Sequence, residues 1–484
     1  MKYIKIIIVA VVACAFHACN TEEFLNPLPD SAIVADTFFE NDKDLLAGII
    51  GIYDAIQGVN ENTNTSLVSS NRGIQFEYML SEMRSDNTRT ATLEGSKADF
   101  HRYIVDANNV QSEDYYASMY DIIFRANNVM NFIDIADAEN QSSYMAEAKF
   151  LRAFAYFKLV RLYGDVPLVT SVVGPLDNDL LFNRVATAQV YEQIVSDLQD
   201  AVDNLDNDYK SRASKAAAQG LLAKVYLTQE NRRYSEAEQL CQDIIDGGGF
   251  NLEPNFNDVF YNELNNEIIF AIQYEAGNSL ESQSFSSEFT AAFRQGREDG
   301  HNIVNENLIA DFDLLGGNRT SVSYVTFGNS NEVAKFLPEG TDIAASPPTY
   351  GGSPRDAGND WIVLRYADVL LMHAEAIMAG GNETSSGSAI DSYMDVKVRA
   401  GFDPVDDRPS VLSKDALLAE RRVELAFENH RFYDLLRFEV ADEILGAHAL
   451  EMGYSGYSLR QLLLPIPARE INLSGGLLVQ NPGY

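Results

Sequence analysis

The stretch KAAAQGLLAKVYLTQENRRYSEAEQLCQDIID, residues 215–246, contains two helical patterns separated by a short polar turn. Small residues recur on one face of the first pattern, at Ala217, Gly220 and Ala223. Tyr226 follows on the same helix, and Tyr234 and Ala237 open the second pattern. Small residues let two helices approach closely, and the tyrosines would fill the wedge between them. The stretch therefore predicts a helix–turn–helix unit.

This unit resembles a tetratricopeptide repeat, a helix–turn–helix module of about 34 residues. Related helical patterns occur in residues 120–136, 190–205 and 366–398. One such unit cannot bury its own apolar face, so several helix pairs must stack against one another. We therefore expect a mainly all-α fold.

The clearest single helix lies in YMAEAKFLRAFAYFKLVRLYGDVPLV, residues 144–169. Its apolar face is formed by residues three or four positions apart, namely Ala148, Leu151, Ala155, Leu159 and Leu162. We expect Gly164 to end this helix and Pro167 to impose an extended exit. Arg152 and Arg161 lie off the apolar face, and we expect both to form salt bridges.

Two stretches lack a long helical pattern, at residues 58–110 and 251–360. The second is rich in Gly, Ser, Asn, Pro and aromatic residues and contains only short strand-like pieces such as EIIFAIQY. Long irregular segments inside compact domains often carry function. We expect the two stretches to lie over the helical scaffold and to form a binding face.

The N-terminus has the features of a secretory signal. Lys2 and Lys5 precede an apolar run of eleven residues, 6–16, which is too short to span a membrane. We predict a signal peptide over residues 1–18, with Cys19 as the first mature residue. This arrangement resembles the lipobox of bacterial lipoproteins, in which that cysteine receives a lipid. The alternative is an ordinary secreted protein with an incidental cysteine.

The composition limits the possible partners. The formal net charge is −35, and removal of Lys2 and Lys5 makes it −37. Such a surface repels phosphate backbones, which excludes nucleic acid as a partner and weighs against highly sulfated or uronic polysaccharides. The mature chain holds only Cys19 and Cys241, so no disulfide framework is expected, and Cys241 lies on an apolar helical stripe typical of the core.

The sequence shows no catalytic or metal-binding motif. There is no His-x-x-x-His pair, no Gly-rich phosphate loop and no Gly-x-Ser-x-Gly elbow. His373, in HAE, lies among apolar residues in the middle of an expected helix and is interpreted as packing. We expect no catalytic residues, no metal ligands and no cofactor, although the sequence leaves open whether calcium binds among the acidic loops.

Eight motifs together resemble the SusD/RagB family of outer-membrane lipoproteins. In chain order they are FLNPLPDSAIVADTFFENDKDLLAGIIGIYDAI, EAKFLRAFAYFKLVRLYGDVPLV, EIIFAI, LRYADVLLMHAEA, VKVRAGF, ERRVELAFENHRFYDLLRF, LLPIPAREI and QNPGY. The resemblance covers essentially the whole mature chain. It implies an all-α fold with four tetratricopeptide-like units plus a loop-rich region with a few short strands.

The resemblance also implies a location and a role. Members of the family are anchored outside the cell on the outer membrane, cap a SusC-like TonB-dependent barrel, and capture oligosaccharides or peptides without being enzymes. Glu22 and Glu23 match the acidic export signal that follows the lipidated cysteine. We expect a tether over residues 19–34 and a single SusD-like domain over 35–484, with its helical scaffold at about 35–250 and 361–440 and a loop-rich insertion at about 251–360.

The charged stretch ERRVELAFENHRFYDLLRF, residues 420–438, raises the question of acid–base catalysis. Opposite charges lie three positions apart in three pairs: Arg421 and Glu424, Glu428 and Arg431, and Arg431 and Asp434. Such pairs can meet along a helix. Because family members with different ligands share the motif, we interpret it as architecture.

A sugar-binding site needs aromatic platforms with amides, carboxylates and guanidinium groups around them. Trp361, the only tryptophan, is expected in the core. The first loop region offers Arg72, Asp86, Asn87, Arg89, Phe100, His101 and Tyr103, although it lacks the tryptophans that family members carry there. The second offers Phe293, Arg294, Tyr324 and Tyr350.

Three functions stay open from the sequence. The first is a glycan-capturing lipoprotein, for which the acidity favours a neutral β-glucan such as laminarin. The second is a peptide- or protein-binding lipoprotein of the RagB type. The third is a surface glycoside hydrolase with paired carboxylates, although no spacing singles out a pair.

Overall fold

The structure is a computed structural model that describes residues 38–60, 71–174, 177–290, 299–342, 345 and 349–484. Eight long helices form a scaffold: α4 (Asp42–Gln57), α6 (Val110–Asn131), α7 (Gln141–Tyr163), α9 (Thr187–Asn204), α10 (Lys215–Thr228), α11 (Tyr234–Asp246), α16 (Tyr366–Met378) and α17 (Gly387–Arg399). Each contacts the next, which gives four successive helix pairs. The prediction of a mainly α-helical fold on four tetratricopeptide-like units is confirmed.

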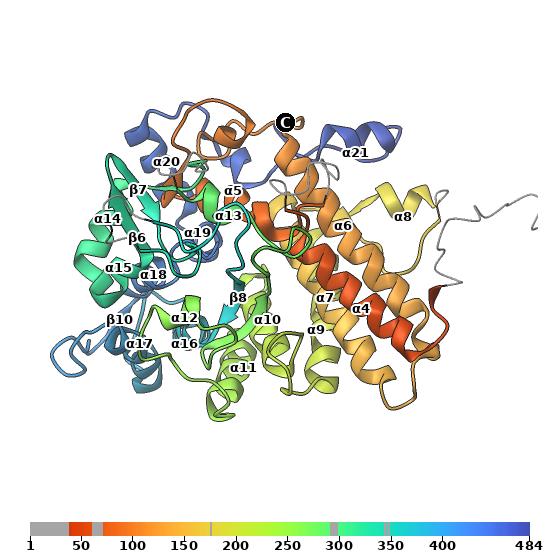
Figure 1. Ribbon diagram of the computed structural model, residues 1–484, viewed down its shortest axis with the longest axis horizontal. Coiled ribbons are helices and arrows are strands. Elements are labelled where there is room, and N and C mark those ends of the chain that lie inside the picture. The colour runs from red at the N-terminus through yellow and green to blue at the C-terminus, as the bar shows by residue number, and fades with distance from the viewer. Residues whose placement is uncertain (1–37, 61–70, 175–176, 291–298, 343–344, 346–348) are drawn as a thin grey trace, which may run out of the picture.

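Figure 1 shows the course of this scaffold. It runs from α4, α6, α7 and α9 at the right, through α10 and α11 at the bottom, to α16 and α17 at the lower left. The C-terminal helices are α18 (Lys414–Glu424), α19 (Arg431–Arg437), α20 (Ala441–Met452) and α21 (Ala468–Leu473). Within the described ranges, no helix is both long and apolar enough to cross a bilayer.

The expected α10–α11 helix–turn–helix unit forms, but its Gly220 packs against a strand residue rather than against another helix. The Ser214 hydroxyl caps α10 by accepting a hydrogen bond from the Ala217 backbone N–H at 3.1 Å. Gly220 lies against Leu364, so closely that a Cβ at this position would be 2.3 Å from the Leu364 Cδ2 atom. Cys241 is a free thiol in the core, and its burial raises the pKa of the thiol. The expected core role of Cys241 is confirmed.

Helix α7 ends where the sequence predicts. Gly164 adopts a φ of +73°, and β2 (Val166–Pro167) follows and pairs with β3 (Arg184–Val185). Arg152 forms the expected salt bridge, through two N–O contacts of 2.8 Å with Asp197 on α9. The expectation for Arg161 was wrong, because its guanidinium lies between two aromatic rings and pairs with no carboxylate in the described part of the chain.

The loop-rich insertion contains β4 to β7 and several short helices. An antiparallel sheet has the order β1 (Thr88–Arg89), β5 (Ile303–Val304), β7 (Ser330–Val333) and β6 (Tyr324–Phe327). The short helices around it are α12 (Asp258–Tyr261), α13 (Phe285–Glu288), α14 (Glu306–Asp311) and α15 (Thr320–Ser323). Two short helices lie outside the insertion, namely α5 (Glu77–Leu80) and α8 (Asn178–Phe182). The strand pair β9 (Glu383–Thr384) and β10 (Leu412–Ser413) also lies outside it.

Strands β4 (Ile268–Ile272) and β8 (Trp361–Arg365) pair antiparallel and join the two ends of the insertion to the scaffold. Trp361 is buried and stacks on Phe336, with ring centroids 5.1 Å apart. This confirms the core role expected for Trp361. His373 is also buried, and its Nδ1 atom hydrogen-bonds the Ser392 hydroxyl at 2.8 Å, as expected of a packing residue.

The charged stretch 420–438 is not one helix. The chain leaves helical geometry between α18 and α19, where Phe427 and Asn429 adopt φ values of +69° and +64°. The three pairs expected at a spacing of three residues do not form. Arg421 pairs with Asp368 and Asp434 instead, and Arg431 pairs with Asp86. Glu424 pairs with Arg319, Arg365 and Arg399. The pair that does form at this spacing is Arg437 with Asp434, at 2.8 Å.

The charges of this stretch join the insertion to the scaffold instead. Arg365 on β8 contacts Glu267, Glu424 and Glu428 at 2.5–2.7 Å. Arg319 and Lys335 of the insertion extend the network to Glu420, Glu424 and Glu428 at 2.6–2.8 Å. All of these side chains are buried, so each charge requires its partners. The interpretation of the stretch as architecture is confirmed.

Candidate functional site

The two loop-rich regions meet at one junction. Strand β1 of the first pairs with β5 of the second, Thr88 opposite Val304 and Arg89 opposite Ile303. The Ala91 N–H donates to the Gly300 carbonyl at 2.7 Å beside this pair. The two regions therefore contact each other, and the expectation that they form a binding face stays a prediction. Phe293 and Arg294 lie outside the described residues, as does Cys19.

Arg72 lies inside this junction. Its guanidinium is 4.0 Å from the centroid of the Phe76 ring, donates to the Ser284 hydroxyl at 3.2 Å and lies 3.7 Å from Glu288. Burial raises the pKa of the Glu288 carboxyl, but Lys97 and Arg72 outweigh it, so the pKa is lowered. Arg72 thus joins the two regions to each other, and it is buried rather than presented at the surface.

Asp86 and Asn87 are structural as well. Asp86 receives two hydrogen bonds from Arg431, at 2.8 and 3.0 Å, and an ion pair from Arg422 at 2.9 Å. Burial opposes ionisation of Asp86, but the two arginines hold its pKa well below the ordinary value. The Asn87 amide donates to Glu82 at 2.8 Å and accepts from Arg422 at 2.8 Å. Both side chains are buried and fully engaged, which leaves neither for a sugar.

The aromatic platform expected from Phe100, His101 and Tyr103 is wrong, because all three rings are buried. His101 and Tyr103 pack edge-on against Tyr454 and Tyr457, at centroid distances of 5.3 and 5.0 Å. Burial, followed by the charges of Arg89 and Arg102, lowers the pKa of His101 to about 3, so this ring is neutral. Rings held in the core cannot stack on a ligand.

Three of the expected residues stay partly exposed: Arg89, Tyr324 and Tyr350. The Arg89 guanidinium donates to the Thr90 carbonyl at 3.2 Å. Tyr324, on β6, packs against Phe312 with ring centroids 5.4 Å apart. The structure does not bring these three into one group.

A groove of about 900 Å³ opens beside the junction. Gln57 connects the groove to the first loop region. Its backbone carbonyl accepts a hydrogen bond from Gln75 of that region at 3.1 Å and one from the Tyr274 hydroxyl in the groove at 3.0 Å. Helix α12, the edges of β4 and β8, and the segments 273–281 and 351–360 form its walls. Strand β8 and α12 lie near the middle of Figure 1.

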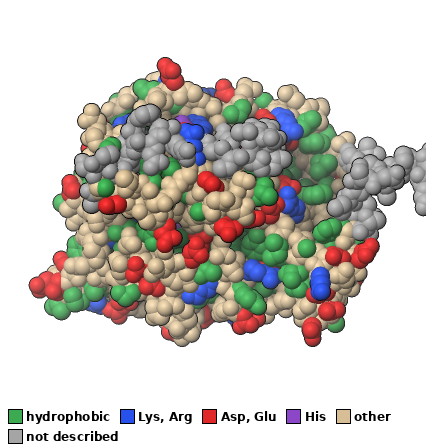
Figure 2. All heavy atoms as spheres, viewed as in Figure 1, with side chains coloured by type: hydrophobic (Ala, Val, Ile, Leu, Met, Phe, Trp, Pro, Cys, Tyr) green, Lys and Arg blue, Asp and Glu red, His purple; other side chains and the backbone are tan. Residues whose placement is uncertain are grey.

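The groove is lined by acceptors and aromatic rings. Its carboxylates are Glu263, Glu275, Glu281, Glu339, Asp356 and Asp360, and its rings are Phe260, Tyr261 and Tyr274. No lysine or arginine occurs among the described lining residues. Figure 2 shows acidic side chains scattered over the face of the molecule seen in this view. The groove would therefore repel anions and accept hydrogen bonds from hydroxyl or cationic groups.

Three acceptor atoms in one wall of the groove have no hydrogen-bond partner among the described residues: Asp356 Oδ1, Asn359 Oδ1 and Asp360 Oδ2. Asn359 is held in place by its amide N–H, which donates to the Leu337 carbonyl at 2.9 Å. The other oxygen of Asp360 accepts from the Tyr274 backbone N–H at 3.1 Å. Burial is the main cause that raises the pKa of Asp360 to about 7. A ligand that donates hydrogen bonds would satisfy these atoms.

The sequence placed the second part of the binding face within residues 251–360 but missed the groove. The signal that could have found it is DAGND, residues 356–360, which sets two carboxylates and an amide directly before an expected buried strand. Residues 273–281 add two glutamates in a turn. Only the pairing of β4 with β8 brings these two segments together. Among the residues that the structure describes, no group of three or more His, Cys, Asp or Glu side chains could hold a metal ion.

Four stacked helix pairs with a groove built from loops define a helical-repeat protein. Similarity to known protein families identifies its class more closely. Residues 339–484 match the model of the SusD family. Residues 23–227 match a model described as starch-binding and associating with the outer membrane. The chain is a SusD-like family protein.

Relatives and solved structures agree with this assignment. A SusD-like protein of Formosa agariphila is 28% identical over the full length of both chains. Another, of Bacteroides ovatus, is 26% identical over 89% of this chain and 82% of its own. The fold matches a laminarin-binding SusD-like protein with a TM-score of 0.74 and 24% identity, covering 92% of this chain and 100% of that one. A SusD superfamily protein of Bacteroides vulgatus matches with a TM-score of 0.77 and 21% identity, covering 93% and 100%.

Proposed function

We propose that this protein captures neutral oligosaccharides at the cell surface and delivers them to a SusC-like TonB-dependent transporter in the outer membrane. The observation that carries the proposal is the groove of about 900 Å³, with its unpartnered acceptors and no cation among its described lining residues. Sugar hydroxyls supply the donors that such a wall lacks, and the half-buried ring of Tyr261 offers a surface for the C–H face of a sugar.

The charge of the groove supports a neutral sugar. Sulfated or uronic chains would bring anions against Glu275, Asp356 and Asp360 without a nearby cation to offset them. The names of related structures support a β-glucan as the ligand. One fold neighbour is named as laminarin-binding, and another, from Bacteroides thetaiotaomicron, is titled as a complex with laminarihexaose, with 20% identity and a TM-score of 0.75.

Binding of this kind should be weak. Burying about 100 Å² of a sugar face against a ring contributes about 2.5 kcal/mol. Much of that is lost to the entropy of association. Dissociation constants between micromolar and millimolar are therefore expected, which suits a protein that releases its ligand to a transporter. Neither capture nor release requires a cofactor or a catalytic step.

The lipid on Cys19 would keep the protein on the outer face of the membrane, where such a ligand arrives. Two or more acyl chains hold a protein stably at a bilayer, whereas a single chain does not. Co-purification of one TonB-dependent barrel with the full-length protein from detergent-solubilised native membranes would support the transporter partner. Recovery of the protein without any barrel, under conditions that preserve other membrane complexes, would contradict it.

Isothermal titration with laminarihexaose, a xylogluco-oligosaccharide and a sulfated oligosaccharide tests the ligand class. We expect heat from a neutral ligand and none from the sulfated one. Asn359→Ala and Asp360→Ala should each weaken binding about tenfold, whereas Asp406→Ala, an exposed acidic residue outside the groove, should leave it unchanged. Tight binding of the sulfated chain would overturn the proposal, and new reducing ends after incubation with a polysaccharide would show a hydrolase instead.

The same carboxylates favour one second candidate, a basic peptide. Lysine or arginine side chains of a peptide would pair with Asp356 and Asp360 in the groove. Titration with a lysine-rich peptide at two ionic strengths separates the candidates, because an ion-paired peptide weakens strongly with salt and a neutral sugar does not.

A further inference from the structure

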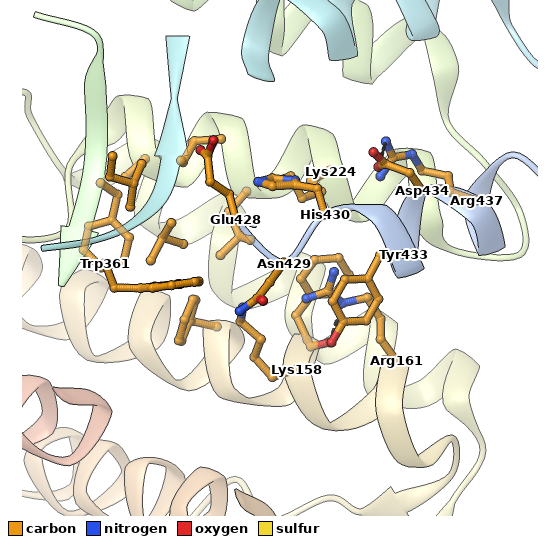
Figure 3. Close-up of a pocket in the computed structure, with 18 of the residues that line it drawn as sticks. Lys158, Arg161, Lys224, Trp361, Glu428, Asn429, His430, Tyr433, Asp434 and Arg437 are labelled. Atoms are coloured by element: carbon orange, nitrogen blue, oxygen red, sulfur yellow. Dashed lines mark hydrogen bonds and ion pairs between the residues drawn. The ribbon is translucent and has the colours of Figure 1, made fainter. Parts of the chain in front are cut away.

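A smaller cavity, of about 40 Å³, lies inside the scaffold between α7, α10, β8 and the turn from α18 to α19. Figure 3 shows Trp361 at one end of this cavity and Asp434 and Arg437 at the other, with Lys158, Asn429, Arg161 and Tyr433 between them. Aromatic side chains form much of the wall, including Phe154, Phe157 and Phe270. Nothing in the proposed function uses this cavity.

Arg161 brings an unneutralised charge to the cavity. Its guanidinium lies 3.9 Å from the centroid of Phe157 and 3.7 Å from that of Tyr433, and its Nε atom donates to the Phe157 carbonyl at 3.0 Å. No carboxylate in the described part of the chain forms an ion pair with it. Its neighbour Lys158 differs, because both oxygens of Glu77 accept hydrogen bonds from the Lys158 ammonium at 2.6 and 2.8 Å. In a chain with a net charge of −35, an arginine without an acidic partner is unexpected.

Two buried polar side chains in the same cavity have unused hydrogen-bonding atoms. Asn429 is 6% exposed and Tyr433 is 5% exposed. Within the part of the chain that the structure describes, neither the Oδ1 nor the Nδ2 atom of Asn429 has a hydrogen-bond partner, and the Tyr433 hydroxyl has none. Buried polar groups are nearly always satisfied, by protein or by a bound molecule. In Figure 3 the Asn429 side chain points toward the part of the cavity where Lys158 and Arg161 lie.

The size and chemistry of the cavity define its ligand. A water molecule needs roughly 10–15 Å³ of this kind of space, so the cavity holds about three or four small groups. A sugar ring is too large, and the positive charge of the partly exposed Arg161 favours an anion over water alone. A phosphate dianion would bring more charge than one arginine offsets. A carboxylate has one charge and a planar pair of oxygens that matches a guanidinium edge, while a short alkyl group suits aromatic walls.

We infer that this cavity binds a short-chain monocarboxylate, acetate or propionate. The carboxylate oxygens accept from Arg161, from the Asn429 amide and from the Tyr433 hydroxyl. The alkyl group lies against the rings of the wall, and one water molecule satisfies Asn429 Oδ1. The site is separate from the groove proposed to bind sugars, so either can fail without the other.

Titration and thermal melting of the full-length protein test the ligand class. Sodium acetate and sodium propionate should bind with millimolar dissociation constants and raise the melting temperature. Sodium chloride at equal ionic strength and propionamide, the neutral analogue of propionate, should do neither. Hexanoate should also fail, because its chain exceeds the space. Equal effects of propionamide or hexanoate would overturn the inference, as would the absence of any effect of propionate.

Variants locate the site. Arg161→Gln removes the charge and should weaken propionate binding at least tenfold. Tyr433→Phe keeps the ring against Arg161 but removes the hydroxyl, and should weaken binding a few-fold with the fold intact. Asn429→Asp places a like charge beside the carboxylate and should abolish binding. Arg102→Gln, a matched control outside the cavity, should bind as the parent does. Unchanged affinity in both Arg161→Gln and Tyr433→Phe would overturn the assignment, as would ligand density elsewhere in a propionate-soaked crystal.

Discussion

Arg365 on β8 and Glu428, in the turn between α18 and α19, form a bidentate buried ion pair with N–O distances of 2.7 and 3.0 Å. The two residues are 63 positions apart in the chain. The pair fixes the end of the loop-rich insertion to the turn that also carries Asn429. Both the groove and the small cavity therefore depend on it for their shape, since Ile362 on β8 lines both and its β8 neighbours line the cavity.

Replacing Arg365 should destabilise the protein strongly. Arg365→Ala leaves Glu267, Glu424 and Glu428 buried near one another with fewer cations, which should cost about 3–5 kcal/mol. Urea unfolding measures this change. Arg408→Ala breaks an exposed pair with Asp391 and should cost less than 1 kcal/mol. Similar losses in the two variants would contradict the role given to the buried network.

Asp360 should make stability depend on pH. Its pKa in the folded protein is about 7, compared with an ordinary value of 3.8, so the folded state holds a proton that the unfolded state has already lost. Stability should therefore fall as pH rises from about 4 to about 7 and then stay at the lower level. Asp360→Asn removes this penalty and should gain up to about 4 kcal/mol over the parent above pH 7, with no difference below pH 4. Parallel stability curves for the two proteins would contradict this.

Ionisation of Asp360 should also strengthen sugar binding, because a carboxylate accepts a hydroxyl proton more strongly than a carboxylic acid does. We expect the affinity for laminarihexaose to rise several-fold between pH 6 and pH 8. Titration in Asp360→Asn should show a flat profile over the same range. A pH dependence that survives in this variant would assign the effect to another group.

Gly220→Ala should disturb the contact between α10 and β8. The added Cβ would lie 2.3 Å from the Leu364 Cδ2 atom, and Leu364 is buried. Overpacking of this kind costs about 1–3 kcal/mol, and thermal unfolding would measure it. Gly249→Ala is the matched control, because a Cβ there meets no atom within 4 Å. Equal stability of the Gly220 variant and the parent would show that the helix and strand can separate without penalty.

Cys19→Ser tests the anchor, which lies outside the described residues. The variant should lose metabolic labelling with palmitate and leave the membrane fraction, because the thiol is the expected site of lipid attachment. A Cys241→Ser variant is the control and should stay labelled, since that thiol is buried in α11. Retention of label in Cys19→Ser would remove the anchor from the proposal.

Local patterns in the sequence predicted the scaffold well. Helix α7 has its apolar face, its glycine stop and its proline exit within one continuous stretch, and neighbouring residues decide all three features. The stretch 215–246 likewise predicted a helix–turn–helix unit without reference to the rest of the chain, although its Gly220 packs against Leu364 on β8 rather than against a helix. The eight motifs then predicted how many such pairs would stack.

The candidate site was less predictable, because exposure is not a local property. Phe100, His101 and Tyr103 have the residue types of a sugar platform, yet Tyr454 and Tyr457, more than 350 positions later, cover two of them. Asp86 likewise has the chemistry of a sugar contact but meets Arg431 in the core. Their residue types suit ligand binding, but their burial gives them a structural role.

The sequence by itself determined the repeated helix pairs, the motifs of the family and the acidic character that excludes nucleic acid, because these depend on residue type and short spacing. Only the tertiary structure decided which side chains are left without partners. Pairing of β4 with β8 sets Asp360 beside Tyr274, and the break at Phe427 and Asn429 sets an unpaired amide in the same cavity as Arg161. Both results depend on contacts between residues far apart in the chain. The free energy of those contacts depends on burial, which no single stretch of sequence determines.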